Sequence, residues 1–122
     1  MATPNIVNVA TINAKNATAL LTGTSRTEAL DVPADKVAKI NTILVANVDG
    51  TNAADITVEV SVDNGSTYFA IAKTISVPAD SSLSLIGKDN GFYLDETDLL
   101  AVTASANSDL VATASWEEMK DA

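Results

Sequence analysis

Apolar and polar residues alternate over short stretches of this chain. In residues 56–62, Ile-Thr-Val-Glu-Val-Ser-Val, every second residue is β-branched and apolar. A period of two over seven residues predicts a half-buried strand with one apolar face. The side chains expected to point inward are those of Ile56, Val58, Val60 and Val62. Residues 110–116 alternate in the same way, and residues 100–104 do so more weakly.

Residues 37–48 differ because they are apolar on both faces around Ile43-Leu44-Val45. Such a run predicts a central strand, or a strand covered on both sides. Shorter strands are expected at residues 6–12, 17–23, 27–32 and 67–72. Residues 34–40 have room for a single helical turn at most, since Pro33 precedes them and β-branched residues follow. The polar residues 117–122 are expected to fray.

Turn signals separate these stretches. Asn64-Gly65 between two strand-like runs predicts a β-hairpin, because both residues tolerate positive φ. The tetrapeptide Val-Pro-Ala-Asp occurs twice, at residues 32–35 and 77–80. Two copies of four residues do not make a repeat architecture. We interpret each as a corner between strands that begins at a proline.

About eight to ten short strands in 122 residues predict an all-β fold, a β-sandwich or jelly roll, with a small barrel as the alternative. Apolar residues make up 47% of the chain and aromatics 4%, so the core is expected to be aliphatic. We interpret residues 1–122 as one domain. Residues 1–23, small and polar, are a candidate N-terminal arm or edge-strand segment that could pair with a neighbour.

The net charge of −9, from 16 acidic and 7 basic residues, argues against two classes of partner. Nucleic acids and anionic membranes attract clustered Lys and Arg, whereas Arg26 is the single arginine and the lysines are scattered. No apolar run approaches the ~18 residues of a membrane-spanning helix. The sequence begins without the charged and apolar regions of a signal peptide, so synthesis in a cytoplasm is expected.

The sequence offers little catalytic chemistry, because it contains neither histidine nor cysteine. This excludes Ser-His-Asp and Cys-His arrangements and the ligands that zinc prefers. The acidic run Asp95-Glu96-Thr97-Asp98 could be a carboxylate pair or a cation site. We interpret it as an acidic turn in which Asp98 accepts hydrogen bonds from nearby backbone N–H groups.

Two further polar segments, residues 49–52 and 63–66, carry oxygen atoms that could bind calcium. Neither has the spacing of an EF-hand loop, and both have the composition of ordinary turns. Trp116 shares a face with Leu110, Ala112 and Ala114 and is expected to fill the core. No catalytic, cofactor-binding or metal site is therefore predicted, and the chain is not expected to be an enzyme.

The order of strands and turns resembles that of small β-sandwich virion proteins of tailed bacteriophages. The segments that carry this resemblance lie between residues 37 and 116. They are residues 39–48, the alternating strand that ends in Asp63-Asn64-Gly65, and residues 68–72, 75–83 and 93–102. Proteins of this kind decorate (cement) the capsid or belong to the neck and tail.

The resemblance implies a non-enzymatic structural protein of the virion without a cofactor. It further implies a homotrimer or other homo-oligomer, attached to the major capsid protein or to neck or tail proteins. Capsid decoration on the outside of the head is the first hypothesis, and a neck, tail or fibre protein the second. A carbohydrate- or receptor-binding sandwich is the alternative from another class. Its candidate stacking residues are Tyr68, Phe69, Phe92 and Tyr93.

Overall fold

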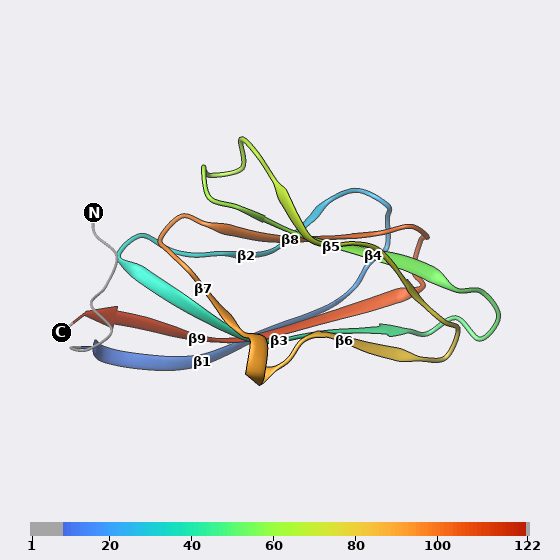
Figure 1. Ribbon diagram of the computed structural model, residues 1–122, viewed down its shortest axis with the longest axis horizontal. Helices are drawn as coiled ribbons and strands as arrows, with labels where there is room; N and C mark the ends of the chain where they lie inside the picture. Colours follow the sequence, from blue (N-terminus) through green and yellow to red (C-terminus); the bar gives the residue numbers. More distant parts are fainter. Residues whose placement is uncertain (1–8, 122) are drawn as a thin grey trace.

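The computed structural model describes residues 9–121, which form two antiparallel sheets packed face to face (Figure 1). Sheet A contains β1 (Val9–Leu20), β9 (Leu110–Asp121), β3 (Lys36–Asn47) and β6 (Ser82–Ile86) in that spatial order, with β7 (Phe92–Leu94) also paired to β3. Sheet B has the order β2 (Thr27–Asp31), β8 (Leu99–Ala104), β4 (Ala54–Ser61) and β5 (Phe69–Val77). A single 3-10 turn, Lys88–Asn90, leads into β7. The predicted all-β sandwich is confirmed.

The core lies between the sheets and is made of aliphatic side chains, as the composition predicted. Ile56 and Val58 of β4 face it together with Leu100 and Val102 of β8, because these residues pair across the two strands in alternating register. Each fully buried side chain of this size stabilises the fold by about 1.5–3 kcal/mol. Trp116 also packs in the core, as expected. Its indole N–H has no hydrogen-bond partner within residues 9–121.

The prediction for Val62 is wrong. Strand β4 ends at Ser61, which is fully buried, and Val62 is 64% exposed. The Ser61 hydroxyl donates to Asp63 Oδ1 at 2.9 Å and accepts from the backbone N–H of Gly65 at 2.8 Å. The hydrogen bonds of the hairpin turn therefore begin at Ser61, although the alternation in the sequence continues to Val62. The last apolar side chain on the inward face of β4 is that of the half-buried Val60.

The prediction that residues 117–122 fray is wrong for residues 117–121, and Ala122 lies outside the described residues. Strand β9 continues to Asp121, with β1 on one side and β3 on the other. Glu118 and Met119 are buried, and Glu118 Oε1 accepts a hydrogen bond from Lys36 Nζ at 3.1 Å. Residues 117–121 are polar, but they stay in the sheet because they pair with a strand on each side.

The corners and the hairpin follow the predictions. Both Val-Pro-Ala-Asp segments carry the chain from sheet B to sheet A, and both bury the valine. In each, the proline carbonyl accepts from the backbone N–H three residues later, and Asp35 and Asp80 adopt φ of 64° and 56°. Asn64 and Gly65, at φ of 58° and 91°, join β4 to β5 as the predicted hairpin.

The N-terminal segment contains one strand where two were predicted. Residues 9–20 form β1 without a break, and its polar centre, Asn13–Asn16, stays in the strand. An edge strand accepts polar residues on both faces because neither face is fully covered. Within residues 9–121, β1 pairs only with β9. The predicted strand residues 6–8 lie outside the described residues.

Candidate assembly surfaces

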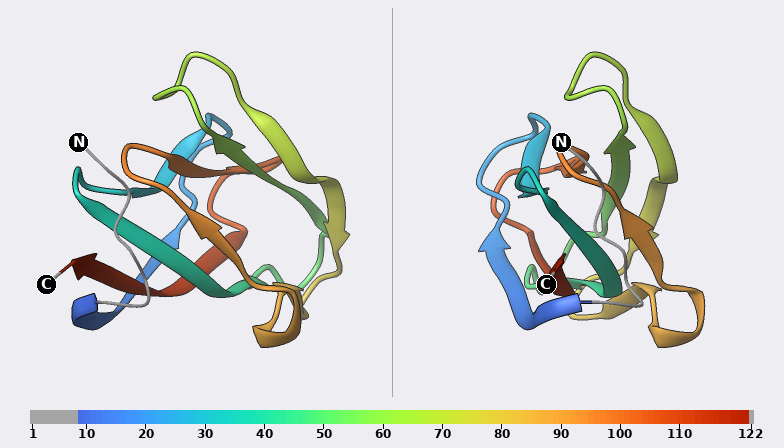
Figure 2. Two further views of the ribbon diagram at one scale, coloured as in Figure 1. Left: turned by 60° about the vertical axis from the view of Figure 1, so that its left-hand side comes forward. Right: turned by 90° about the vertical axis from the view of Figure 1, so that its left-hand side faces the viewer.

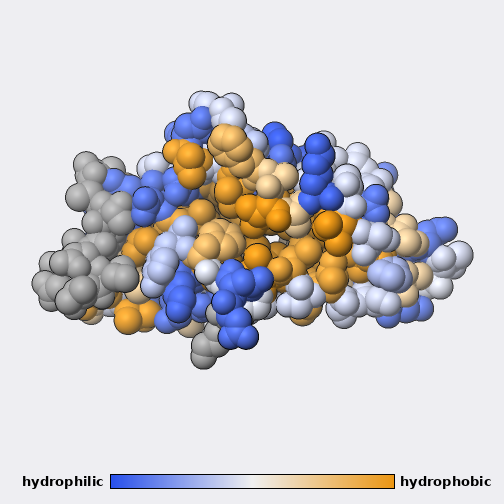
Figure 3. Space-filling model, in the orientation of Figure 1, coloured by the Kyte–Doolittle hydropathy of each residue, from blue (hydrophilic) through white to orange (hydrophobic). Residues whose placement is uncertain are grey.

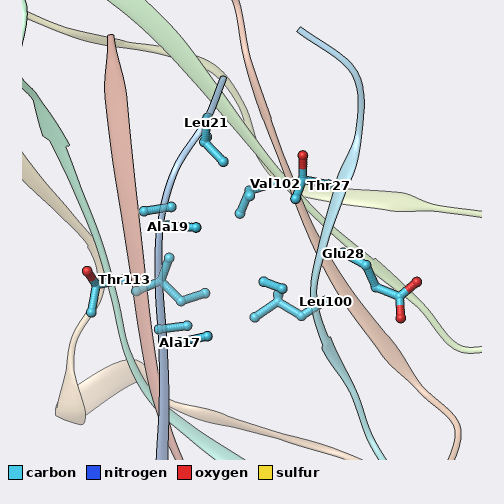
Figure 4. Close-up of a pocket in the computed structure, with 12 residues that line it drawn as sticks. Ala17, Ala19, Leu21, Thr27, Glu28, Leu100, Val102 and Thr113 are labelled. Carbon is cyan, nitrogen blue, oxygen red and sulfur yellow. The ribbon is translucent and has the colours of Figure 1, made fainter. Parts of the chain in front are cut away.

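The sandwich opens between β1 of sheet A and β2 of sheet B. The opening is an apolar groove of about 90 Å³, several times the ~10–15 Å³ that one water molecule needs. In Figure 4, Ala17, Ala19 and Leu21 face Leu100 and Val102 across this space, and the Glu28 carboxylate points away from it. We call this opening the β1–β2 groove. Its lining residues are Ala17, Ala19, Leu21, Thr27, Glu28, Ala29, Ile43, Leu100, Val102, Ala112, Thr113 and Ala114.

The groove exists because small side chains meet where the two sheets separate. Ala17 is the cross-strand partner of Ala114, and Ala19 is the partner of Ala112. Four alanines cannot fill a space that leucines or valines fill elsewhere between the sheets. This groove was not predicted from the sequence, although its signal was present as alternating alanines in β1 and β9.

The outer edge of β1, which has no partner strand within residues 9–121, borders this groove. Lys15 is the single charged residue in the twelve residues of β1, and Ile12 and Leu20 are exposed. Long regular edge strands with few charges are sites where another strand can pair, and soluble monomers usually protect them. The edge of β5 is less regular, because its pairing with β4 shifts register twice and Thr74 has φ of 48°.

A second apolar surface lies on the opposite side of the molecule. Phe69 is 59% exposed, Ile71 and Ile75 of the same strand are also exposed, and Tyr93 of β7 is 49% exposed. Figure 3 looks onto this side, where apolar side chains gather between the edges of the two sheets. We call Phe69, Ile71, Ile75 and Tyr93 the β5–β7 surface.

The aromatic pairs divide as alternation predicts, with Phe69 and Tyr93 more exposed than Tyr68 and Phe92. The Tyr68 ring is covered on one face by Arg26, whose guanidinium carbon lies 3.9 Å from the ring centre. Arg26 also donates to both carboxylate oxygens of Glu59, at 2.9 and 3.2 Å, which holds the pKa of the guanidinium above its usual value. The single arginine is therefore engaged within its own chain.

The acidic run forms a turn of the kind that we predicted. The Asp98 carboxylate accepts from the backbone N–H of Asp95 at 2.9 Å, and the N–H of Asp98 donates to the Asp95 carbonyl at 3.1 Å. Burial raises the pKa of the Asp98 carboxyl above its usual range. Glu96 turns elsewhere and accepts from the backbone N–H of Asp35 at 2.7 Å. The carboxylates of Glu96 and Asp98 thus have separate structural partners.

The two other polar segments are also organised by internal hydrogen bonds. Asp49 accepts from the N–H of Thr51 and from the Asn52 amide, and Asp63 accepts from the N–H of Thr67 and the Ser61 hydroxyl. These bonds lower the pKa of both carboxyl groups. Among residues 9–121, no group of three acidic side chains converges as a metal site would require.

No protein-family model matches the chain, and no curated protein matches it in sequence. Among solved structures, the chain is similar to that of Bacillus endospore appendages, a family of disulfide-linked pili. The TM-score is 0.56 at 14% identity, over 94% of this chain and 90% of that chain. The likeness is one of fold.

A second similar structure is that of the T13 particle of infectious bursal disease virus. It has a TM-score of 0.50 at 7% identity, over 91% of this chain and 31% of that chain. A pentameric capsid protein from metagenomic phage sequences has a TM-score of 0.40 at 15% identity, over 88% of this chain and 65% of that chain. No helix in the described part of the chain has the length and apolarity to cross a membrane.

Proposed function

We propose that this chain is a non-enzymatic structural subunit of a phage virion that associates with copies of itself. The observation that carries the proposal is the pair of open apolar edges, the β1–β2 groove and the β5–β7 surface. Exposed apolar surface of this kind is typical of protein interaction sites. The fold supports the proposal as well, since similar sandwiches occur in the pilus and virus-particle structures.

Within the virion, capsid decoration on the outside of the head is the role that we favour. A chain with a net charge of −9 and one internally paired arginine suits a surface that faces solvent, away from packaged DNA. The proposal that the subunit has no catalytic role rests on the sequence, which contains neither histidine nor cysteine. A neck, tail or fibre position and a carbohydrate-binding module are the competing assignments.

Localisation on purified particles tests the proposal. Virions banded by density gradient from a lysate of the producing host should contain this chain by mass spectrometry, in many copies per particle. Cryo-electron microscopy should place it over the head lattice. Density at the neck or tail would instead support a neck or tail protein. If the particles contain their other structural proteins but not this chain, the virion assignment is wrong.

A further inference from the structure

The two apolar surfaces lie on opposite sides of one molecule. In the right-hand view of Figure 2, β1 and β2 lie at one side, and β5 and β7 lie at the other. The strand order of sheet B places β2 and β5 at its two ends. A contact between these ends would set sheet B of one copy beside sheet B of the next.

The surfaces are complementary in shape. The β1–β2 groove is recessed because alanines line it, including Ala17 and Ala19. The β5–β7 surface instead exposes large side chains, with Phe69 59% and Ile71 43% exposed. Large apolar side chains that enter a recess lined by small ones bury apolar area on both partners, and pairs of this kind dominate binding energy at interfaces.

The surfaces are also complementary in charge. Strand β2 carries Glu28 and Asp31 and no basic residue, while β5 carries Lys73 and no acidic residue. All three side chains are exposed, and none forms an ion pair with another residue in the described part of the chain. Opposite charges at the rim of a contact favour association and fix its register.

We propose that copies of this chain associate head to tail, with the β5–β7 surface of one copy seated in the β1–β2 groove of the next. The inference rests on the proposed self-association and adds which surfaces meet. Phe69 and Ile71 enter the groove, and Lys73 lies near Glu28 and Asp31 of the neighbour. Because the two patches differ, a single contact leaves one partner with a free β1–β2 groove and the other with a free β5–β7 surface. Such a contact builds a closed ring where the rotation between copies permits closure, and an open filament where it does not.

Mixing two variants tests the head-to-tail arrangement directly. Phe69→Glu blocks only the β5–β7 surface, and Ala19→Glu blocks only the groove. Each variant alone should be monomeric by light scattering coupled to size exclusion, while the wild type forms rings or filaments. A mixture of the two should give a one-to-one dimer and nothing larger, because one intact surface of each kind remains.

Controls separate this result from unfolding. Leu44→Glu introduces the same charge at an exposed residue on the outer face of sheet A and should assemble as the wild type does. If Ala19→Glu does not fold, reversing the charges of Glu28 and Lys73 tests the same contact. Glu28→Lys and Lys73→Glu should each weaken assembly, and the double variant should restore it. Circular dichroism on every variant checks folding.

The outcomes distinguish this inference from the proposed function. Folded single variants that assemble normally, a mixture that stays monomeric, or a wild-type two-fold dimer would each overturn the head-to-tail contact. A wild type that is monomeric in solution but present on virions would overturn it as well and leave the virion role standing. If the chain forms rings or filaments but is absent from virions, the head-to-tail contact stands and the virion role is overturned.

Discussion

The side chain of Asn47 shows how single residues hold this sandwich together. It is buried at the end of β3, where its amide donates to the carbonyls of Asn52 and Val77 at 3.0 and 2.9 Å. Its carbonyl accepts from the backbone N–H of Asp49 at 2.9 Å. A buried amide with all of these partners satisfies three backbone groups at once, and such groups are costly to leave unpaired.

Burial predicts very different costs for two isoleucines that are cross-strand partners. Ile56 is fully buried, and Ile75 opposite it is 39% exposed. We expect Ile56→Ala to lower the free energy of unfolding by about 2–5 kcal/mol, because it leaves a cavity in the core. Ile75→Ala should cost ~1 kcal/mol or less, as usual for partly exposed sites. Urea unfolding of both variants checks the ranking, and equal losses would mean that the inward face of β4 is misassigned.

The buried carboxyl of Asp98 predicts an unusual pH dependence. Burial raises its pKa, so the folded chain holds this proton more tightly than the unfolded chain does. Its contribution to the free energy of unfolding therefore falls as pH rises through that pKa. Asn keeps a carbonyl acceptor for the Asp95 N–H and carries no charge. We expect Asp98→Asn to be at least as stable as the wild type at neutral pH, with an advantage that shrinks toward about pH 4, near the ordinary Asp pKa of ~3.9.

Thermal unfolding across this pH range measures the effect, and Asp49 supplies a control of opposite sign. Hydrogen bonds lower the pKa of Asp49, so its contribution is present above the ordinary Asp pKa and is lost as pH falls. Asp49→Asn should thus be less stable than the wild type at neutral pH and approach it in acid. If Asp98→Asn behaved in the same way as Asp49→Asn, the Asp98 charge would be stabilising and our assignment would be wrong.

At the scale of elements, alternation predicted the interior strands well and the ends of strands poorly. The pattern from Ile56 to Val58 survives in the fold because both neighbours of β4 are in place. It fails at Val62, because the hydrogen bonds of the Ser61 hydroxyl start the turn there and leave the Val62 side chain exposed. It also fails for residues 117–121, since composition does not reveal which strands will pair on either side.

Strand β9 is the element whose end matters most. It lies between β1 and β3, so its last residues hold two neighbours. We expect a chain that stops after Trp116 to be largely unfolded, because β1 loses its pairing from Val9 to Ala14 and the buried Glu118 and Met119 are removed. Circular dichroism and urea unfolding of the truncated chain measure this. A truncated chain with an unchanged midpoint would support the original expectation that this end frays.

For the whole molecule, the sequence predicted a sandwich but not its open sides. Periodicity tells which face of a strand is buried, and says nothing of which strands lie at the edges of a sheet. The β1–β2 groove arises only when Ala17 and Ala19 of β1 meet Ala114 and Ala112 of β9 across from sheet B. The β5–β7 surface likewise draws its residues from strands of two different sheets. Candidate assembly surfaces of this kind follow from topology, which the alternation alone left open.

The position of β9 also governs when the protein can fold. Both β1 and β3 pair with this last strand, and β1 has no other partner within residues 9–121. While the ribosome is still making the chain, β1 must wait until residues 110–121 have emerged. Sheet A is thus completed only after β9 has been made, and until then an almost uncharged strand is left open to the wrong partners. Nascent chains should therefore depend on chaperones more than those of a sandwich in which neighbouring strands pair in chain order.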